Sequence, residues 1–169
     1  GGTPVFFPLK EDFHLDFEAM EKRVTSRTKI VFISSPGNPT GRVLREDEIR
    51  ALAGLAVRKD LLLVVDEAYH RLIYSGVRFL SICQVEEVRN RSILLNSFSK
   101  TYAMTGWRVG YMVADAPLIK DRVTFHKAMT ICPNVPAQMA CAAAAAGPQE
   151  CVEAMRREYE KRKVLVEKK

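Results

Sequence analysis

The sequence SILLNSFSKTYAMTGWRVGYMVA, residues 92–114, sets the arrangement of the predicted sheet. Two apolar runs, 92–96 and 109–114, flank a short connection that contains Lys100. Parallel neighbours need a crossover, and residues 97–108 are too few for a full crossover helix with loops at both ends. We therefore predict that strand 109–114 runs antiparallel to strand 92–96 and begins at the same sheet edge as Lys100.

Further apolar runs bounded by turn residues predict the other strands. They are KIVFIS (29–34), LLLVV (61–65) and, as a weaker candidate, PVFFPL (4–9). Continuous runs without alternation are typical of strands that are covered on both faces.

The segment REDEIRALAGLAVRKD, residues 45–60, carries apolar residues at helical spacing between the first two strong strands. This order predicts a βαβ unit with a parallel pair and a right-handed crossover. A shorter crossover over 66–91 leads to strand 92–96. Three further helices are expected, one beginning near Pro117, one from Pro136 to Gly147 and one from about residue 148. The predicted fold class is α/β, three-layer, with a mostly parallel sheet and one antiparallel strand.

Composition excludes several classes of protein. At 169 residues and 47% hydrophobic content, one domain with a real core is expected. Four cysteines lie without a CxxC pair or a histidine at metal-ligand spacing, which favours a reduced, cytoplasmic protein with no metal site. No apolar stretch reaches the ~18 residues of a membrane span, so no membrane partner is expected.

The net charge of +6 is concentrated at one end of the chain. Residues 155–169 carry seven Lys or Arg against three Glu. Interleaved charges of both signs are typical of a solvated helix face, so we favour this interpretation over a phosphate-binding patch and expect no nucleic-acid partner.

Polar groups follow three successive strand ends, where open parallel sheets bind ligands. Each has an ordinary interpretation: GNPTG as a turn, Asp66 as a helix N-cap, Lys100 as a solvated lysine and Arg108 as a surface ion-pair partner. The antiparallel return brings Arg108 to the same edge. The full set is Asn38, Asp66, Tyr69, Ser97, Ser99, Lys100 and Arg108.

Together these groups fit one ligand. A desolvated lysine amine can attack an aldehyde, and two hydroxyls with a guanidinium can bind a phosphate dianion. A carboxylate can keep a pyridine nitrogen protonated, while an amide and a phenol can hydrogen-bond a ring oxygen. These are the requirements of pyridoxal 5'-phosphate (PLP).

With these residues in place, the sequence resembles the class I/II aminotransferases, which are fold-type I PLP-dependent enzymes. The resemblance rests on SSPGNPTG (34–41), VVDEAYHRLIY (64–74) and NSFSKTYAMTGWRVGY (96–111), in this order, and covers essentially the whole chain. It implies that Lys100 bonds covalently to the cofactor and moves the proton between the substrate Cα and C4′. It also implies that Asp66 pairs with the pyridinium nitrogen. Asn38 and Tyr69 would bind the ring oxygen, with Tyr69 counted among the catalytic residues, while Ser97, Ser99 and Arg108 would hold the phosphate.

The resemblance also implies a domain organisation and partners. Residues 1–147 correspond to part of the PLP-binding large domain, and residues 148–169 to the start of the long helix towards a small domain. Counterparts of the family's N-terminal segment and small domain are absent from this sequence, so we expect a large domain truncated at both ends, with little or no activity alone. The expected partners are an amino acid and a 2-oxo acid, with a homodimer for the full-length protein.

Several alternatives stay open. The same residues suit other PLP enzymes of this fold, such as a carbon–sulfur β-lyase or a cyclopropane-forming synthase. An aminotransferase-like sensor domain of a transcription regulator is a second class. Direct nucleic-acid binding by residues 155–169 is a third, and it predicts salt-sensitive affinity. Aspartate, alanine and aromatic amino acids are all possible substrates.

Overall fold

The sheet has the predicted topology. A computed structural model describes residues 2–168, apart from the side chain of residue 121. The strand order is β1-β2-β3-β4, with β1–β2 and β2–β3 parallel and β3–β4 antiparallel. The α/β fold class with one antiparallel strand is therefore confirmed. The strands are β1 (Ile30–Ser34), β2 (Leu62–Asp66), β3 (Ser92–Ser97) and β4 (Gly110–Val113).

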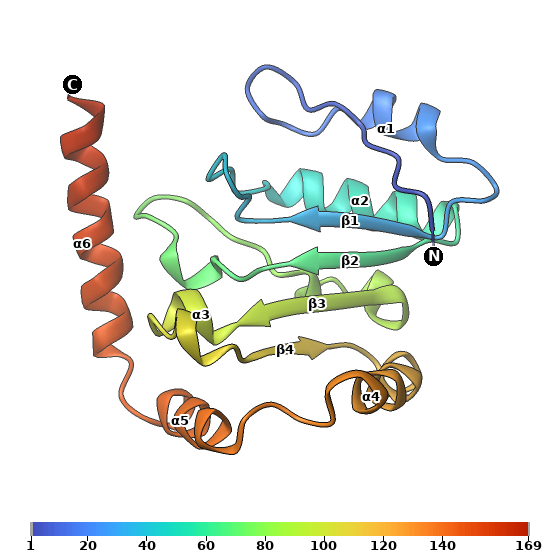
Figure 1. The fold of residues 1–169 in the computed structure, drawn as a ribbon. Helices are drawn as coiled ribbons and strands as arrows, with labels where there is room; N and C mark the ends of the chain where they lie inside the picture. The colour runs from blue at the N-terminus through green and yellow to red at the C-terminus, as the bar shows by residue number, and fades with distance from the viewer. Residues whose placement is uncertain (1, 169) are drawn as a thin grey trace.

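The register brings the carboxyl ends of the parallel strands to one edge. Ser34 pairs with Asp66, and Asp66 pairs with Leu95 one strand further on. Ser97 pairs with Gly110, so β4 starts where β3 ends. In Figure 1 the arrowheads of β1, β2 and β3 all point towards the side on which α6 stands. We call this side the carboxyl edge.

The hydrophobic core lies between the sheet and α2 (Glu46–Arg58). Ile49, Leu52 and Leu55 of α2 are each 1% exposed, and they belong to the same apolar cluster as Leu63 and Val65 of β2. The predicted apolar periodicity of residues 45–60 is thus the buried face of the crossover helix. This packing fixes the parallel strands and hence the carboxyl edge.

A short helix that was not predicted, α1 (Phe17–Arg23), precedes β1. The Asp16 side chain caps it by accepting a hydrogen bond from the Ala19 amide at 2.9 Å, and Met20 is its buried residue. The second crossover, residues 67–91, contains three short 3-10 helices. They are η1 (His70–Leu72), η2 (Ile82–Gln84) and η3 (Glu86–Arg91).

The helices after the sheet begin and end close to the predicted residues. Pro117 lies in the first turn of α4 and Pro136 in that of α5, while Gly147 caps the end of α5. In Figure 1, α4 and α5 lie beside β4, and α6 rises along the carboxyl edge. The elements are α3 (Phe98–Thr101), η4 (Thr105–Trp107), α4 (Ala116–Thr130), α5 (Val135–Ala146) and α6 (Glu150–Glu167).

Two expectations about strands were wrong. Residues 4–9 form no strand, and their ladder contact is a single bridge between Leu9 and Leu15. Pro4 and Pro8 lack the amide hydrogen that a ladder needs, which explains the failure. The second expectation was that every strand is covered on both faces of the sheet. Most residues of β3 are buried as expected, but Phe32 of β1 is 57% exposed and all of β4 is exposed.

Candidate functional site

The loop after β1 holds Asn38 at the carboxyl edge. The buried Ser35 anchors this loop, because its amide donates to the Asp66 carbonyl at 2.9 Å and its hydroxyl accepts from the Leu44 amide at 3.0 Å. Asn38 itself is exposed, and its Nδ2 donates to the Tyr69 hydroxyl at 3.4 Å. The two residues predicted to share the ring oxygen of the cofactor are therefore neighbours.

Asp66 is the last residue of β2 and is half-buried. Its Oδ1 accepts from the Ala68 amide at 3.0 Å, so one oxygen stabilises the turn that leads to Tyr69. This hydrogen bond resembles that of a helix N-cap, which is the ordinary interpretation of an Asp at the end of a strand. Within residues 2–168 the structure records no second hydrogen bond to the Asp66 carboxylate. A carboxylate has lone pairs for several donors, so a ring nitrogen can be accommodated as well.

Lys100 lies in the single-turn helix α3, which starts directly after β3. The Ser97 hydroxyl caps this helix by accepting from the Ser99 amide at 3.1 Å. Lys100 is half-buried, and its Nζ lies 5.6 Å from the centroid of the Tyr69 ring. No salt bridge of Lys100 is recorded between residues 2 and 168, so its amine is not held by a carboxylate.

The three predicted phosphate ligands lie at the end of β3 and before the start of β4. Ser99 is buried and Arg108 is exposed. Arg108 has a left-handed backbone with φ 56°, and its guanidinium donates to the Thr105 carbonyl at 2.8 Å. Over the described residues, no contact of this guanidinium with either serine hydroxyl is recorded. Their shared role in phosphate binding stays a prediction.

Sequence reasoning missed Glu67, the residue after Asp66. It is 1% exposed, and its Oε1 accepts from the Ser81 hydroxyl at 3.1 Å and from the Ile82 amide at 2.8 Å. Burial raises the pKa of Glu67 above its ordinary value, against the opposing effect of these two donors. Glu67 thereby fastens the second crossover to the end of β2. The feature of the sequence that could have drawn attention to Glu67 is an acidic residue next to Asp66, directly after an apolar strand.

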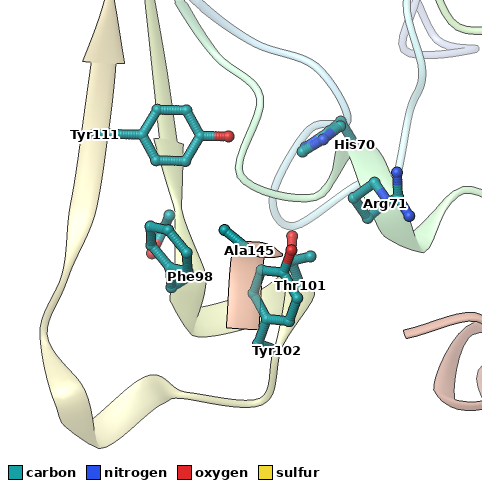
Figure 2. A pocket seen from close by; sticks show the side chains of 8 residues that line it. His70, Arg71, Phe98, Thr101, Tyr102, Tyr111 and Ala145 are labelled. Carbon is teal, nitrogen blue, oxygen red and sulfur yellow. The ribbon is translucent and has the colours of Figure 1, made fainter. Parts of the chain in front are cut away.

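A cavity of about 240 Å³ lies beside these residues (Figure 2). In Figure 2, His70 and Arg71 of η1 face Thr101 of α3 and Tyr102, its C-cap, across the cavity, with Tyr111 of β4 on a third side. Burial lowers the pKa of His70 and raises that of Tyr111. Of the predicted site residues, Ser97 lines this cavity, so the cavity adjoins the predicted cofactor site without coinciding with it. The full lining is His70, Arg71, Ser97, Phe98, Thr101, Tyr102, Tyr111 and Ala145.

The polar groups at the carboxyl edge are of the types that binding of PLP requires. An unpaired amine, a half-buried carboxylate and an amide–phenol pair come from the ends of neighbouring strands. In the described part of the chain, no cluster of three or more His, Cys, Asp or Glu could hold a metal ion. Nor does any helix among the described residues have the length and apolar character to span a bilayer.

Comparison with known proteins identifies the family. The pattern of the family described as aminotransferase class I and II matches residues 1–169. The chain is 40% identical to aromatic-amino-acid aminotransferase 2 of Thermococcus litoralis and 40% identical to aspartate aminotransferase of Pyrococcus abyssi. In each case the match covers 100% of this chain and 44% of the relative.

A solved structure gives the same result. The aromatic aminotransferase from Pyrococcus horikoshii superposes with a TM-score of 0.94 at 39% identity, covering 99% of this chain and 46% of that one. The chain thus spans a little under half the length of the proteins that it matches. The chain belongs to the aminotransferase class I and II family.

Proposed function

We propose that the protein is a PLP-dependent aminotransferase that moves an amino group from an amino acid to a 2-oxo acid. The observation that carries this proposal is the convergence of Asn38, Tyr69 and Lys100, with Asp66 at the neighbouring strand end. In a chain of this family, that arrangement supports one shared cofactor site.

Asp66 is the partner of the ring nitrogen. It extends from the end of β2, and the Ala68 amide fixes one of its oxygens. A carboxylate near this nitrogen keeps it protonated. When bound, PLP supplies an electron-withdrawing ring that stabilises negative charge at the substrate Cα. Asn38 and Tyr69 would donate to the ring oxygen, and their mutual hydrogen bond at 3.4 Å supports this shared role.

Lys100 has two roles. Its amine, in the neutral form that acts as a nucleophile, would hold the cofactor covalently in the resting enzyme. With cofactor and substrate bound, the free Lys100 amine would move the proton between the substrate Cα and C4′. The position of Nζ next to the Tyr69 ring, 5.6 Å from its centroid, supports this dual role, since it places the amine beside a predicted ligand of the cofactor ring.

Ser97, Ser99 and Arg108 bind the phosphate. The Ser97 hydroxyl and the start of α3 lie opposite Gly110 in the β3–β4 register, close in the chain to Arg108. Arg108 uses one N–H group for the Thr105 carbonyl, and a guanidinium has five donors in all. The others remain for a phosphate oxygen pair, which a guanidinium binds in a fork.

The class of amino acid that the protein uses has to be measured with a panel of substrates. Relatives named for aromatic amino acids and for aspartate match this chain at the same identity, so the comparisons do not distinguish the two classes.

We also propose that the protein works as a cytoplasmic homodimer, without nucleic-acid or membrane partners. Exposed apolar side chains of α4 and α5, among them Phe125, Met129 and Met139, support a surface that a second copy covers. Sedimentation velocity of the full-length protein tests this: a monomer at every concentration contradicts the dimer.

The test of the function is covalent trapping. The chain is mixed with PLP, reduced with borohydride and digested, and the labelled peptide is identified by mass spectrometry. The label is expected on Lys100 and absent in Lys100→Ala, while Lys120→Ala serves as the matched control. Label elsewhere, or equal label in Lys100→Ala, contradicts the cofactor site.

Amino transfer is measured separately, on a chain extended to the length of these relatives, because residues 1–169 are expected to have little or no activity alone. In the presence of a 2-oxo acid, the amino group should appear on that acid. Release of ammonia and pyruvate without any 2-oxo acid would instead identify a β-lyase.

A further inference from the structure

The two short helices that carry Tyr69 and Lys100 need support from outside. Tyr69 caps η1, which has three residues, and Lys100 lies in α3, which has four. Helices of a single turn are not stable by themselves in water, because the cost of nucleation exceeds what one turn gains. The cavity of about 240 Å³ lies between them, so apolar packing across this gap is incomplete. Other contacts must therefore fix their orientation.

The first such contact joins α6 to the loop after η1. Both oxygens of the Glu160 carboxylate bind Ser75: Oε1 accepts from its amide at 2.7 Å, and Oε2 from its hydroxyl at 3.1 Å. Arg156 lies one turn earlier in α6 and donates to Oε2 of Glu160 at 2.9 Å and to the Ile73 carbonyl at 3.5 Å. Glu160 thus clamps the segment that directly follows η1.

The charge state of this clamp is stable at neutral pH. The hydrogen bond from the Ser75 amide, assisted by Arg156, holds the pKa of Glu160 below its ordinary value despite some desolvation. The Arg156 side chain is 16% exposed and that of Glu160 is 28% exposed, so the pair is shielded more than the other ion pairs of α6. Shielding reduces screening by salt.

The second contact joins the start of α6 to the end of α3. Tyr102, the C-cap of α3, donates from its hydroxyl to Oε1 of Gln149 at 3.0 Å. Nε2 of Gln149 in turn donates to the carbonyls of Ala144 at 3.0 Å and Gly147 at 2.8 Å. The Gln149 amide is therefore fixed by three hydrogen bonds. Its orientation determines where the hydroxyl of Tyr102, two residues after Lys100, can be held.

We propose that Gln149 and Glu160 of α6 are positioning residues for the cofactor site, Gln149 through α3 and Lys100, and Glu160 through η1 and Tyr69. This inference rests on the proposed PLP chemistry of those two residues. Neither Gln149 nor Glu160 touches the reacting groups. α6 stands along the carboxyl edge in Figure 1, where one rigid helix can hold both short helices at once.

The same helix offers a matched control. Glu158 pairs with Arg162 at 2.9 Å within α6, both side chains are more than half exposed, and neither has a recorded bond outside the helix. The variants Glu160→Ala and Gln149→Ala are therefore compared with Glu158→Ala. Glu160→Gln is added because it keeps the side-chain length while removing the charge.

The first measurement needs no cofactor. Hydrogen exchange of the chain is followed by mass spectrometry. Gln149→Ala should speed exchange in residues 98–103 by about fivefold, which corresponds to the one lost hydrogen bond of Tyr102. Glu160→Ala should speed exchange in residues 69–77 by at least about fivefold, because Ser75 loses two hydrogen bonds. Glu160→Gln should fall between Glu160→Ala and wild type, and Glu158→Ala should match wild type in both segments. Unchanged exchange in both Glu160→Ala and Gln149→Ala overturns the inference.

The second measurement separates positioning from simple structural support. The visible band of the cofactor bound to Lys100 is titrated with pH. A misplaced Tyr69 hydroxyl no longer stabilises the ring oxygen anion, so Glu160→Ala should move the midpoint upwards by about half a pH unit. Gln149→Ala should slow borohydride-trapped labelling of Lys100 about threefold or more.

The outcomes are distinct. A labelled wild type whose midpoint and labelling rate are unchanged in both variants overturns this inference alone. A wild-type chain that takes no label on Lys100 overturns the proposed function, and this inference falls with it.

Discussion

Gly110 shows how a single missing side chain shapes the site. A Cβ at this position would lie 2.7 Å from the carbonyl oxygen of Asn96, which is closer than such contacts allow. We predict that Gly110→Ala lowers the free energy of unfolding by about 1–3 kcal/mol, because the β3–β4 pair must shift to relieve the overlap. Urea unfolding measures this. Gly106→Ala is the control, since a Cβ there meets no atom within 4 Å, and an equal loss in both variants would contradict the steric explanation.

Glu67 gives a prediction about pH. Its folded-state pKa is raised above the ordinary 4.5, so the folded chain binds this proton more tightly than the unfolded chain does. Between 4.5 and the raised value, the contribution of Glu67 to stability therefore falls as pH rises. Glu67→Gln keeps an oxygen acceptor for Ser81 and Ile82 but cannot ionise. As pH rises above 4.5, the variant should gain stability relative to wild type in urea unfolding; parallel pH profiles would contradict the assignment.

The places of Asn38, Asp66 and Lys100 in the fold could be predicted, because each lies at or shortly after the end of a strand, while their role as ligands stays a prediction. The positions of Asn38, Asp66 and Lys100 depend on the strand ends, and the apolar runs already locate those ends. Glu67 could not be identified in the same way, because its partners Ser81 and Ile82 come from a crossover without regular helices. The orientation of Arg108 depends on its left-handed backbone and on the Thr105 carbonyl, neither of which has a pattern in the sequence.

Helix α2 is the element that supports the sheet most directly. Leu52 is 1% exposed and lies in the core cluster, whereas Val57 of the same helix is 47% exposed. We predict that Leu52→Ala lowers the free energy of unfolding by about 2–5 kcal/mol, because it leaves a cavity in a packed core. Val57→Ala should change it by less than about 0.5 kcal/mol. Thermal and urea unfolding of both variants test this, and similar losses would mean that burial does not distinguish the two positions.

Elements with a strong apolar pattern were the ones that could be predicted. The runs at 29–34, 61–65, 92–96 and 109–114 correspond to β1–β4, and the short connection correctly predicted the antiparallel return. Helix α1 was missed because seven residues with Met20 as the buried one carry too little periodicity. The strand expected at 4–9 failed for the opposite reason: the segment is apolar, but Pro4 and Pro8 lack the amide hydrogen that a ladder needs, and only the bridge at Leu9 is recorded among the described residues.

The molecule as a whole is packed unevenly. Every residue of the main hydrophobic cluster lies at or before Leu94 in the chain. Beyond the sheet, α4–α6 bury fewer large apolar side chains, and Phe125 and Met129 of α4 are 68% and 67% exposed. Local stability follows the density of buried apolar contacts. We predict that amide hydrogens of α4 exchange at least about tenfold faster than those of α2 and β2 in the same sample. Equal protection across these elements would contradict this gradient.

The amino-terminal ends of the parallel strands β1–β3 lie on the opposite side of the sheet from the carboxyl edge. This opposite side carries none of the candidate site residues. The turn between α2 and β2 lies there, and Lys59, the C-cap of α2, is exposed at it. Once the exposed Cys83, Cys132 and Cys151 are replaced by Ser, a reporter dye attached through Lys59→Cys would sit at the opposite end of β2 from Asp66. Such a labelled molecule would let fluorescence follow folding or assembly while leaving every group of the candidate site unmodified.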